Sequence, residues 1–271
     1  MPRARLGGVP RPIWSGAISF GLVNVPVKLF SATSAKDVRF HQIDGRTNSR
    51  IKQKRVSVAT GDEVPYEDIV KGYELGTDQF VIITPEELDS LETRATRTID
   101  IEDFVDLDQI DPIYYERAYY LVPDKGGAKA YALLRAAMRE SNKVGIAKVV
   151  LRTKQYLAAI RVKDDVLVIE TMLYPDEVNP TDDLDLPREE VEVTDREEKM
   201  ARQLIDSLTT DFEPEKYHDE YRERVLALIE QKASGQEIVL EEASEEPSKV
   251  VDLMAALEAS LAAVKKSKDG G

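Results

Sequence analysis

The chain has 271 residues, of which 42% are hydrophobic and 32% charged, with a formal net charge of −14 and no cysteine. This length allows a sizeable core in one or two domains, and the lack of cysteine excludes disulfides, thiolate nucleophiles and cysteine-ligated zinc. The basic start MPRARLGGVPRP has no apolar run behind it and no run is long enough to cross a bilayer, so we expect a soluble cytoplasmic protein with no membrane partner.

The first predicted elements are two strands in RPIWSGAISFGLVNVPVKLF. Apolar residues alternate over 13–20 and again over 23–29, after a glycine turn. Pro26 places the second strand at an edge, a bulge or a barrel rim, because proline lacks a ladder donor. Further strand-like runs follow at 80–84, 97–101, 117–122, 145–151, 156–162 and 166–172. Short connections join the last three into an antiparallel meander, and about eight strands in all favour a barrel or sandwich.

Helices are predicted between and after these strands. A capping box with proline at the first helical position starts a short helix over 85–92, and 127–140 carries an apolar stripe at helical spacing. A second capping box at Thr194 starts a helix whose inward residues are Met200, Leu204, Ile205 and Leu208. Pro214 is predicted to start another helix, with an apolar stripe that extends to Lys232.

The end of the chain is predicted to be an acidic linker, 236–248, and a last helix over 249–266. An apolar stripe that follows a linker has no obvious core of its own, which favours packing on a partner. Folding back onto the same chain is the alternative left open. The stripe consists of Val250, Leu253, Met254, Leu257, Leu261 and Val264.

Charges are sorted along the chain into alternating blocks. Residues 1–60 hold 11 lysines and arginines against 2 acidic residues, and residues 125–163 hold 10 against 1. The stretches 61–124 and 164–213 are strongly acidic. If both basic blocks share one face, that face attracts a phosphate backbone while the rest of the surface repels it. The alternative, in which basic and acidic blocks pair with each other in the fold, is equally open.

The sequence contains no recognised catalytic motif. It has neither a nucleophile elbow, a phosphate-binding loop nor a zinc-protease helix, and its only histidines are His41 and His218. Acidic clusters occur in DLDQID and in TDDLDLP, and neither matches a calcium loop. We therefore expect no catalytic residue, no metal site and no cofactor. A Mg²⁺-dependent nuclease that uses Asp182, Asp183 and Asp185 stays as an alternative.

The basic blocks supply candidate phosphate contacts. Strand alternation in NSRIKQKRV predicts that Arg50, Lys52 and Lys54 share one face, and basic residues also punctuate the meander and its first turn. No predicted helix carries base-reading side chains, which favours backbone binding without base recognition. The candidate DNA-binding residues are Arg39, Arg50, Lys52, Lys54, Arg55, Lys143, Lys148, Arg152, Lys154 and Lys163.

Several motifs make the chain similar to the bacterial Ku proteins. RPIWSGAISFGLVNVPVKLFSA resembles the N-terminal signature of that family. Further motifs follow in the family's order across residues 11–235, namely RFHQID, RIKQKRV, KGYEL, IDPIYYERAYYLVPD, AYALL, LAAIRV, YPDEV and DFEPEKYHDEY.

The resemblance implies an α+β fold, a Ku-type β-barrel with an extended arm and C-terminal helices in a ring-forming homodimer. It implies sequence-independent binding of double-stranded DNA ends and recruitment and stimulation of the ATP-dependent DNA ligase of bacterial non-homologous end joining, without catalysis, at the nucleoid. The implied division is a barrel core with bridging arm and inserted helices (1–194), C-terminal helices (195–235), the acidic linker (236–248) and a ligase-docking tail (249–271). An acidic protein–protein scaffold is a second alternative.

The chain departs from the family pattern in three places. Many relatives carry a cysteine pair after the RIKYKR-like strand, where this chain has VSVATGDEV, so a zinc-ribbon-like role is absent. Asn179 stands where relatives often have arginine, which puts one contact in doubt. The long lysine-rich tails of some relatives are missing, which leaves the short last helix as the expected ligase-docking element.

Overall fold

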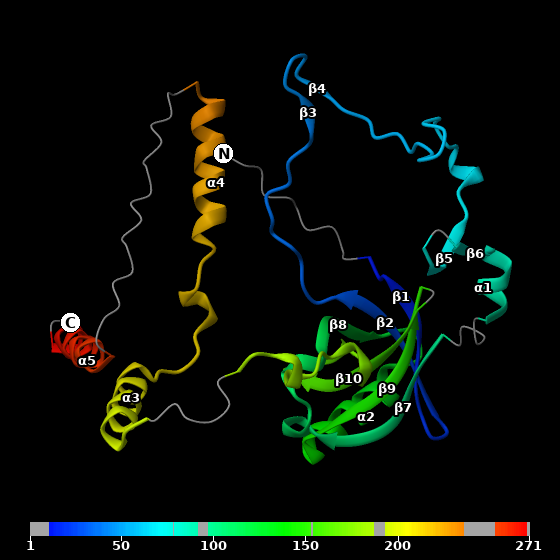
Figure 1. Cartoon of the computed structure of the whole chain (residues 1–271). Coiled ribbons are helices and arrows are strands. Elements are labelled where there is room, and N and C mark those ends of the chain that lie inside the picture. Colours follow the sequence, from blue (N-terminus) through cyan, green and yellow to red (C-terminus); the bar gives the residue numbers. More distant parts are fainter. Residues whose placement is uncertain are drawn as a thin grey trace. The chain divides into compact units, whose positions relative to one another are not determined.

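The structure is a computed structural model that describes residues 11–77, 79–91, 97–152, 154–186, 193–235 and 253–269 (Figure 1). The chain divides into two compact units. The first comprises Met1–Lys36 and His41–Pro180, and the second comprises Asp37–Phe40 and Thr181–Gly271. In the described part of the chain, no helix is long and apolar enough to span a membrane.

Seven strands of the first unit close into a barrel in the order β1-β2-β8-β11-β10-β9-β7. Their pairings are antiparallel except where β1 meets β7 through a short parallel contact of Ala17–Ser19 with Thr98–Asp100. The predicted barrel is confirmed, and so is the meander, since β9, β10 and β11 are successive neighbours. The strands are β1 (Trp14–Phe20), β2 (Val23–Ser31), β7 (Thr98–Asp106), β8 (Tyr115–Pro123), β9 (Lys143–Leu151), β10 (Lys154–Lys163) and β11 (Val166–Met172).

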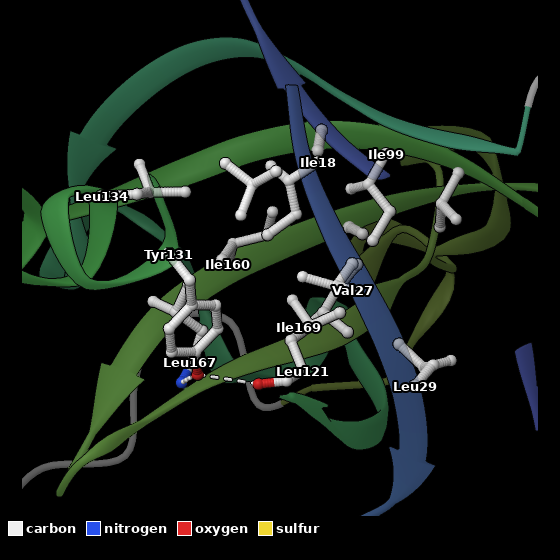
Figure 2. Close-up of a cluster of buried hydrophobic side chains, with 14 of the residues drawn as sticks. Ile18, Val27, Leu29, Ile99, Leu121, Tyr131, Leu134, Ile160, Leu167 and Ile169 are labelled. Carbon is white, nitrogen blue, oxygen red and sulfur yellow. Dashed lines mark hydrogen bonds between the residues drawn. The ribbon is translucent and has the colours of Figure 1, made fainter. Parts of the chain in front are cut away.

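Alternating apolar residues direct one face of each strand into the barrel. Ile18, Val27 and Leu121 come from three different strands and are all fully buried, and Figure 2 shows them in one cluster with Ile160 and Ile169. Burial of each such side chain stabilises the fold by about 1.5–3 kcal/mol. Pro26 lies just outside the β2–β8 pairing, which begins at Val27, so it occupies the predicted rim position.

Helix α2 (Ala128–Ser141) packs on the barrel end where β8 ends and β11 begins. Its buried residues Tyr131, Leu134 and Met138 belong to the barrel core. The Tyr131 hydroxyl donates to the Leu121 carbonyl at 2.7 Å and accepts from the Leu167 amide at 2.8 Å (Figure 2). The helix therefore closes this end of the barrel with both packing and hydrogen bonds.

Between β2 and β7 the first unit carries an arm, defined here as residues 41–91. It contains two small antiparallel sheets, β3 (Ile43–Asp44) with β4 (Ser49–Arg50) and β5 (Lys71–Gly76) with β6 (Gln79–Ile83). Helix α1 (Pro85–Leu91) follows, and its predicted capping box is present, because the Thr84 amide donates to the Glu87 carboxylate at 2.9 Å.

The prediction of a strand through RIKQKRV is wrong. Only Arg50 of that motif lies in a strand, and residues 51–55 have no regular structure. The β3–β4 ladder stops after two residue pairs, and the chain instead enters a loop closed by the bridge between Val56 and Glu63. Alternation over 50–54 therefore does not set a common face for the basic residues there.

The second unit contains α3 (Asp195–Leu208) and α4 (Glu220–Ala233), together with α5 (Leu253–Asp269). The capping box of α3 is confirmed, since the Thr194 amide donates to Glu197 at 2.7 Å. The predicted inward stripe is wrong for Ile205 and Leu208, which are 64% and 60% exposed.

Helix α4 begins later than Pro214, which starts only a single 3-10 turn. The Asp219 side chain accepts from the Arg222 amide at 2.9 Å and makes Asp219 the N-cap. This side-chain cap, and not the proline at 214, determines where the helix starts. The apolar residues predicted to form a stripe on this helix are therefore not buried, and α4 has no buried residue at all.

Helix α5 contacts α3, and the Arg196 guanidinium lies 3.2 Å from the Glu258 carboxylate. Met254, Leu257 and Leu261 are half-buried. The structure thus shows the alternative in which the last helix folds back onto its own chain. The predicted linker 236–248 lies outside the described residues.

Candidate nucleic-acid interface

The strand register distinguishes the two ends of the barrel. Helix α2 covers one end, where β10 turns into β11 at Asp164. The other end, called the mouth, holds the starts of β1, β8 and β10 and the ends of β2, β9 and β11. The chain leaves the barrel at Ser31, beside Tyr119, and returns at Thr98, so both ends of the inserted segment that includes the arm attach at the mouth.

The structure does not bring all the meander cations together. Arg152 and Lys154 lie at the mouth, whereas Lys143 and Lys163 lie at the end covered by α2. Nine residues separate Lys143 from Arg152 along β9, which at roughly 3.3 Å per residue is about 30 Å. Contact of these four cations with DNA stays a prediction. Arg152 and Lys154 belong to one surface of the barrel, and Lys143 and Lys163 belong to another.

Five of the ten candidate cations are paired with carboxylates. Lys54 lies 2.5 Å from Glu63, and the remaining pairs are Lys143–Asp106 at 2.7 Å, Lys148–Glu102 at 2.9 Å, Lys154–Glu177 at 3.3 Å and Lys163–Asp164 at 3.5 Å. Hydrogen bonding to the neighbouring glutamate raises the pKa of Lys148 and of Lys154. For these five lysines the structure therefore shows pairing of basic with acidic blocks. Ion pairs at a solvent-exposed surface contribute little to stability, so a phosphate can displace the carboxylate at low cost.

The other five candidate cations are exposed and have no carboxylate partner among the described residues. Arg50, Lys52 and Arg55 belong to the arm, and the Arg55 guanidinium lies over the Tyr66 ring at 5.4 Å. Arg152 lies at the mouth, and Arg39 belongs to the segment grouped with the second unit. Three of these five candidate cations thus belong to the arm, where they are available to an external anion.

Residues 19–200 match the family model described as the Ku70/Ku80 beta-barrel domain. The chain belongs to the Ku family. It is 49% identical over 260 residues to a protein of Anaeromyxobacter sp. (strain K), covering 96% of this chain and 88% of that one. It is 48% identical over 259 residues to a protein of Heliobacterium modesticaldum (strain ATCC 51547 / Ice1), covering 95% and 93%. A protein of Mycobacterium tuberculosis (strain ATCC 25618 / H37Rv) is 42% identical over 267 residues, covering 95% and 97%. All three are named non-homologous end joining protein Ku.

Sequence reasoning missed one cation of this Ku barrel. Arg117 lines a pocket of about 150 Å³ at the mouth, together with Ile13, Trp14, Tyr119, Leu151, Arg152 and Tyr156. The motif RAYYLV contained the relevant pattern, because alternation along the strand places Arg117 on the same face as Tyr119 and the buried Leu121. Arg117 therefore lies at the rim of this barrel.

The acidic clusters can be assessed as a metal site only where the structure describes their side chains. In the ranges that the structure describes, no three histidine, aspartate or glutamate side chains are grouped closely enough to hold a metal ion. Asp182 lies in a short 3-10 turn, Thr181–Asp183. The nuclease alternative therefore gains no support from the geometry.

Proposed function

We propose that this Ku protein binds the ends of double-stranded DNA without regard to sequence and acts in non-homologous end joining. The observation that carries the proposal is the 42–49% identity, over nearly the whole chain, to proteins named for that process. The closed barrel and the inserted arm support it, because they are the parts from which a ring around a duplex is built.

The arm is the proposed phosphate-binding surface. Arg50, Lys52 and Arg55 are exposed and have no carboxylate partner in the described ranges. The chain as a whole carries a formal charge of −14. A duplex is repelled by most of such a surface and attracted where unpaired cations gather. Arg39, Arg152 and the paired lysines Lys54, Lys143, Lys148, Lys154 and Lys163 are proposed as secondary contacts.

The ring is proposed to form from two copies of the chain. The β5–β6 hairpin exposes Tyr73, Leu75, Phe80 and Ile82, each by 59–67%. A two-stranded hairpin alone is marginally stable in water, and exposed apolar clusters of this kind mark interaction sites. A second copy that covers the hairpin would both stabilise the arm and close the ring.

The remaining part of the proposal concerns the tail and the partner ligase. We assign the barrel core with its arm to residues 1–194, the C-terminal helices to 195–235, a linker to 236–248 and ligase docking to 249–271. The protein itself performs no chemical step in this scheme. It holds the DNA end in place and recruits the ATP-dependent ligase that seals the break.

The decisive test compares linear and covalently closed circular duplexes of the same sequence in a gel-shift assay. A ring that threads onto DNA is expected to bind the linear form and to fail on the circle. Affinity for the linear form is expected to fall steeply between 50 and 200 mM salt, about 10³-fold or more for 6–10 phosphate contacts. Equal binding to both forms would rule out threading.

The same assay separates the alternatives. Cleavage of either DNA after addition of Mg²⁺ would favour the nuclease. No binding to either form at physiological salt would favour a protein scaffold. Analytical ultracentrifugation of the protein alone tests the homodimer, and a monomer at all concentrations would contradict the ring.

A further inference from the structure

The mouth of the barrel is an open pocket with aromatic walls. Trp14, Tyr119 and Tyr156 are half-buried, and each lies on the inward-facing side of its strand. All three pack against the core cluster, which forms the floor of the pocket. The opposite end of the barrel is covered by α2, so the mouth is the open end. Barrel mouths are a common place for ligands.

Two arginines stand at this aromatic pocket. The Arg152 side chain is exposed and has no carboxylate partner among the described residues. Arg117 has one carboxylate nearby, since its Nε lies 3.8 Å from the Glu116 carboxylate, which is too long for a hydrogen bond. Both guanidinium groups therefore have donors available for an anion at the rim of the pocket.

The backbone at Arg152 is unusual for its residue type. It adopts a left-handed conformation, with φ of 61°. The other non-glycine residues with positive φ in the described chain are Asn48, Asn142 and Asp164, which belong to the types that tolerate this conformation best. An arginine held in a strained turn is the arrangement expected where the side chain is needed for function.

The dimensions of the pocket restrict the ligand. Its volume is about 150 Å³, below the roughly 300–1,000 Å³ of pockets that hold a whole cofactor or drug-sized molecule. A single planar ring is the kind of group that three aromatic side chains accept by stacking, and arginine is well suited to bind phosphate. A nucleotide combines a planar ring with a phosphate and therefore matches this pair of features.

We propose that the mouth pocket binds one unpaired nucleotide at the end of a DNA strand. The base enters between Trp14, Tyr119 and Tyr156, and its phosphate contacts Arg117 and Arg152. This inference rests on the proposed function, DNA-end binding. Bases inside a duplex are paired and stacked, so only a frayed or overhanging end offers a base to the pocket without a large unpairing cost. The pocket would thus distinguish overhanging from blunt ends.

Trp14 provides a direct probe, because it is the only tryptophan in the chain and it lines the pocket. The full-length protein is titrated with a blunt duplex capped by a hairpin at one end, and with the same duplex carrying a three-nucleotide 3′ or 5′ overhang. Binding is followed by gel shift and Trp14 emission by fluorescence. We expect both duplexes to bind, and only an overhang to quench Trp14 strongly.

A matched pair of variants tests the role of the arginine. Arg152→Asn keeps a residue that tolerates positive φ and removes the guanidinium, whereas Lys163→Asn removes one charge at the opposite end of the barrel. Arg152→Asn is expected to lower affinity for the overhang duplex about tenfold and to leave the blunt duplex within twofold, as expected for removal of a charge-assisted hydrogen bond. Its melting temperature is expected to stay level or rise. Lys163→Asn is expected not to change the ratio between the two duplexes.

The outcomes separate this inference from the proposed function. Gel-shift binding of both duplexes with equal Trp14 emission would overturn the pocket and leave end binding intact. Binding of neither duplex would overturn both. Quenching by an acidic peptide, with none by the overhang, would assign the mouth to a protein ligand and contradict the proposal.

Discussion

Tyr131 shows how a single polar atom closes the barrel. Its hydroxyl is buried and bridges the Leu121 carbonyl of β8 and the Leu167 amide of β11. Burial raises the pKa of Tyr131, so the hydroxyl stays protonated and continues to donate at neutral pH. One side chain of α2 thereby satisfies two backbone groups at a point where the two strands face the helix.

Replacement of Tyr131 by phenylalanine tests this bridge. The ring and its packing are kept, while a buried carbonyl and a buried amide lose their shared partner. We expect a loss of about 1–3 kcal/mol in the free energy of unfolding, measured by urea denaturation. Tyr66→Phe is the control, because Tyr66 is exposed and its ring, which contacts Arg55, is retained. An unchanged stability for Tyr131→Phe would mean that solvent already satisfies these groups.

Closure of the barrel depends on a close approach at Gly16 of β1. A Cβ atom at this position would clash with the Arg97 carbonyl oxygen and with the Trp14 ring. Glycine is therefore needed where the Trp14 ring crosses the strand and where β1 begins to pair with β7. The absence of a side chain at Gly16 also leaves room for the Trp14 ring, which lines the mouth pocket.

The helices of the second unit differ in how their apolar stripes are used. Helix α5 contacts α3, and its residues Met254, Leu257 and Leu261 are half-buried. In α4, by contrast, Tyr221 and Ile229 are 74% and 40% exposed. An intramolecular contact already covers part of α5, so a ligase that docks on this helix either displaces α3 or binds the outer face of α5. Two substitutions distinguish these two modes of docking.

Leu257→Asp disrupts the half-buried face of α5, and Ala259→Asp changes its exposed face by the same charge. If a ligase docks on the apolar stripe, Leu257→Asp is expected to reduce stimulation of the ligase about tenfold or more, because a charge replaces a half-buried leucine in the contact. Ala259→Asp is expected to have little effect. DNA binding in a gel shift should stay unchanged for both. Loss of DNA binding by either variant would show that the tail has been assigned to the wrong role.

At the scale of the whole molecule, the distribution of charge matters more than its sum. The barrel lysines are largely paired with neighbouring carboxylates, whereas Arg50, Lys52 and Arg55 of the arm have no such partner in the described ranges. A strongly acidic protein can therefore bind a polyanion, provided that the arm is the part that touches it.

The salt dependence of binding measures this contribution. Replacement of Arg50, Lys52 and Arg55 by glutamine is expected to reduce the slope of log K against log salt by roughly 0.9 for each phosphate that the variant no longer neutralises. The same change at Lys199, Arg202 and Lys232, all exposed in the second unit, is the control and should leave the slope almost unaltered. A slope that responds equally to both sets would show that the protein binds DNA through its overall charge and not through the arm.

Local pattern was sufficient to predict most of the fold. Alternation identified the barrel strands, short connections identified the meander, and capping boxes placed the starts of α1 and α3. These features depend on residues that are close together in the sequence, so they can be predicted from the sequence alone. The predicted strand through RIKQKRV failed because a strand needs a partner, and the partner β3 contributes only two residues.

The sequence motifs across residues 11–235 were also sufficient to recognise the Ku family, because each is a short local segment and they follow one another in the same order as in that family. The arrangement of the cations was decided only by the tertiary structure. Barrel closure sent Lys143 and Arg152 to opposite ends and joined Trp14, Arg117 and Arg152 in one pocket. It also paired three lysines with carboxylates from other segments, namely Lys143, Lys148 and Lys154. Spacing along a sequence shows which face of a strand a residue occupies, whereas the strand register decides which residues of distant strands become neighbours.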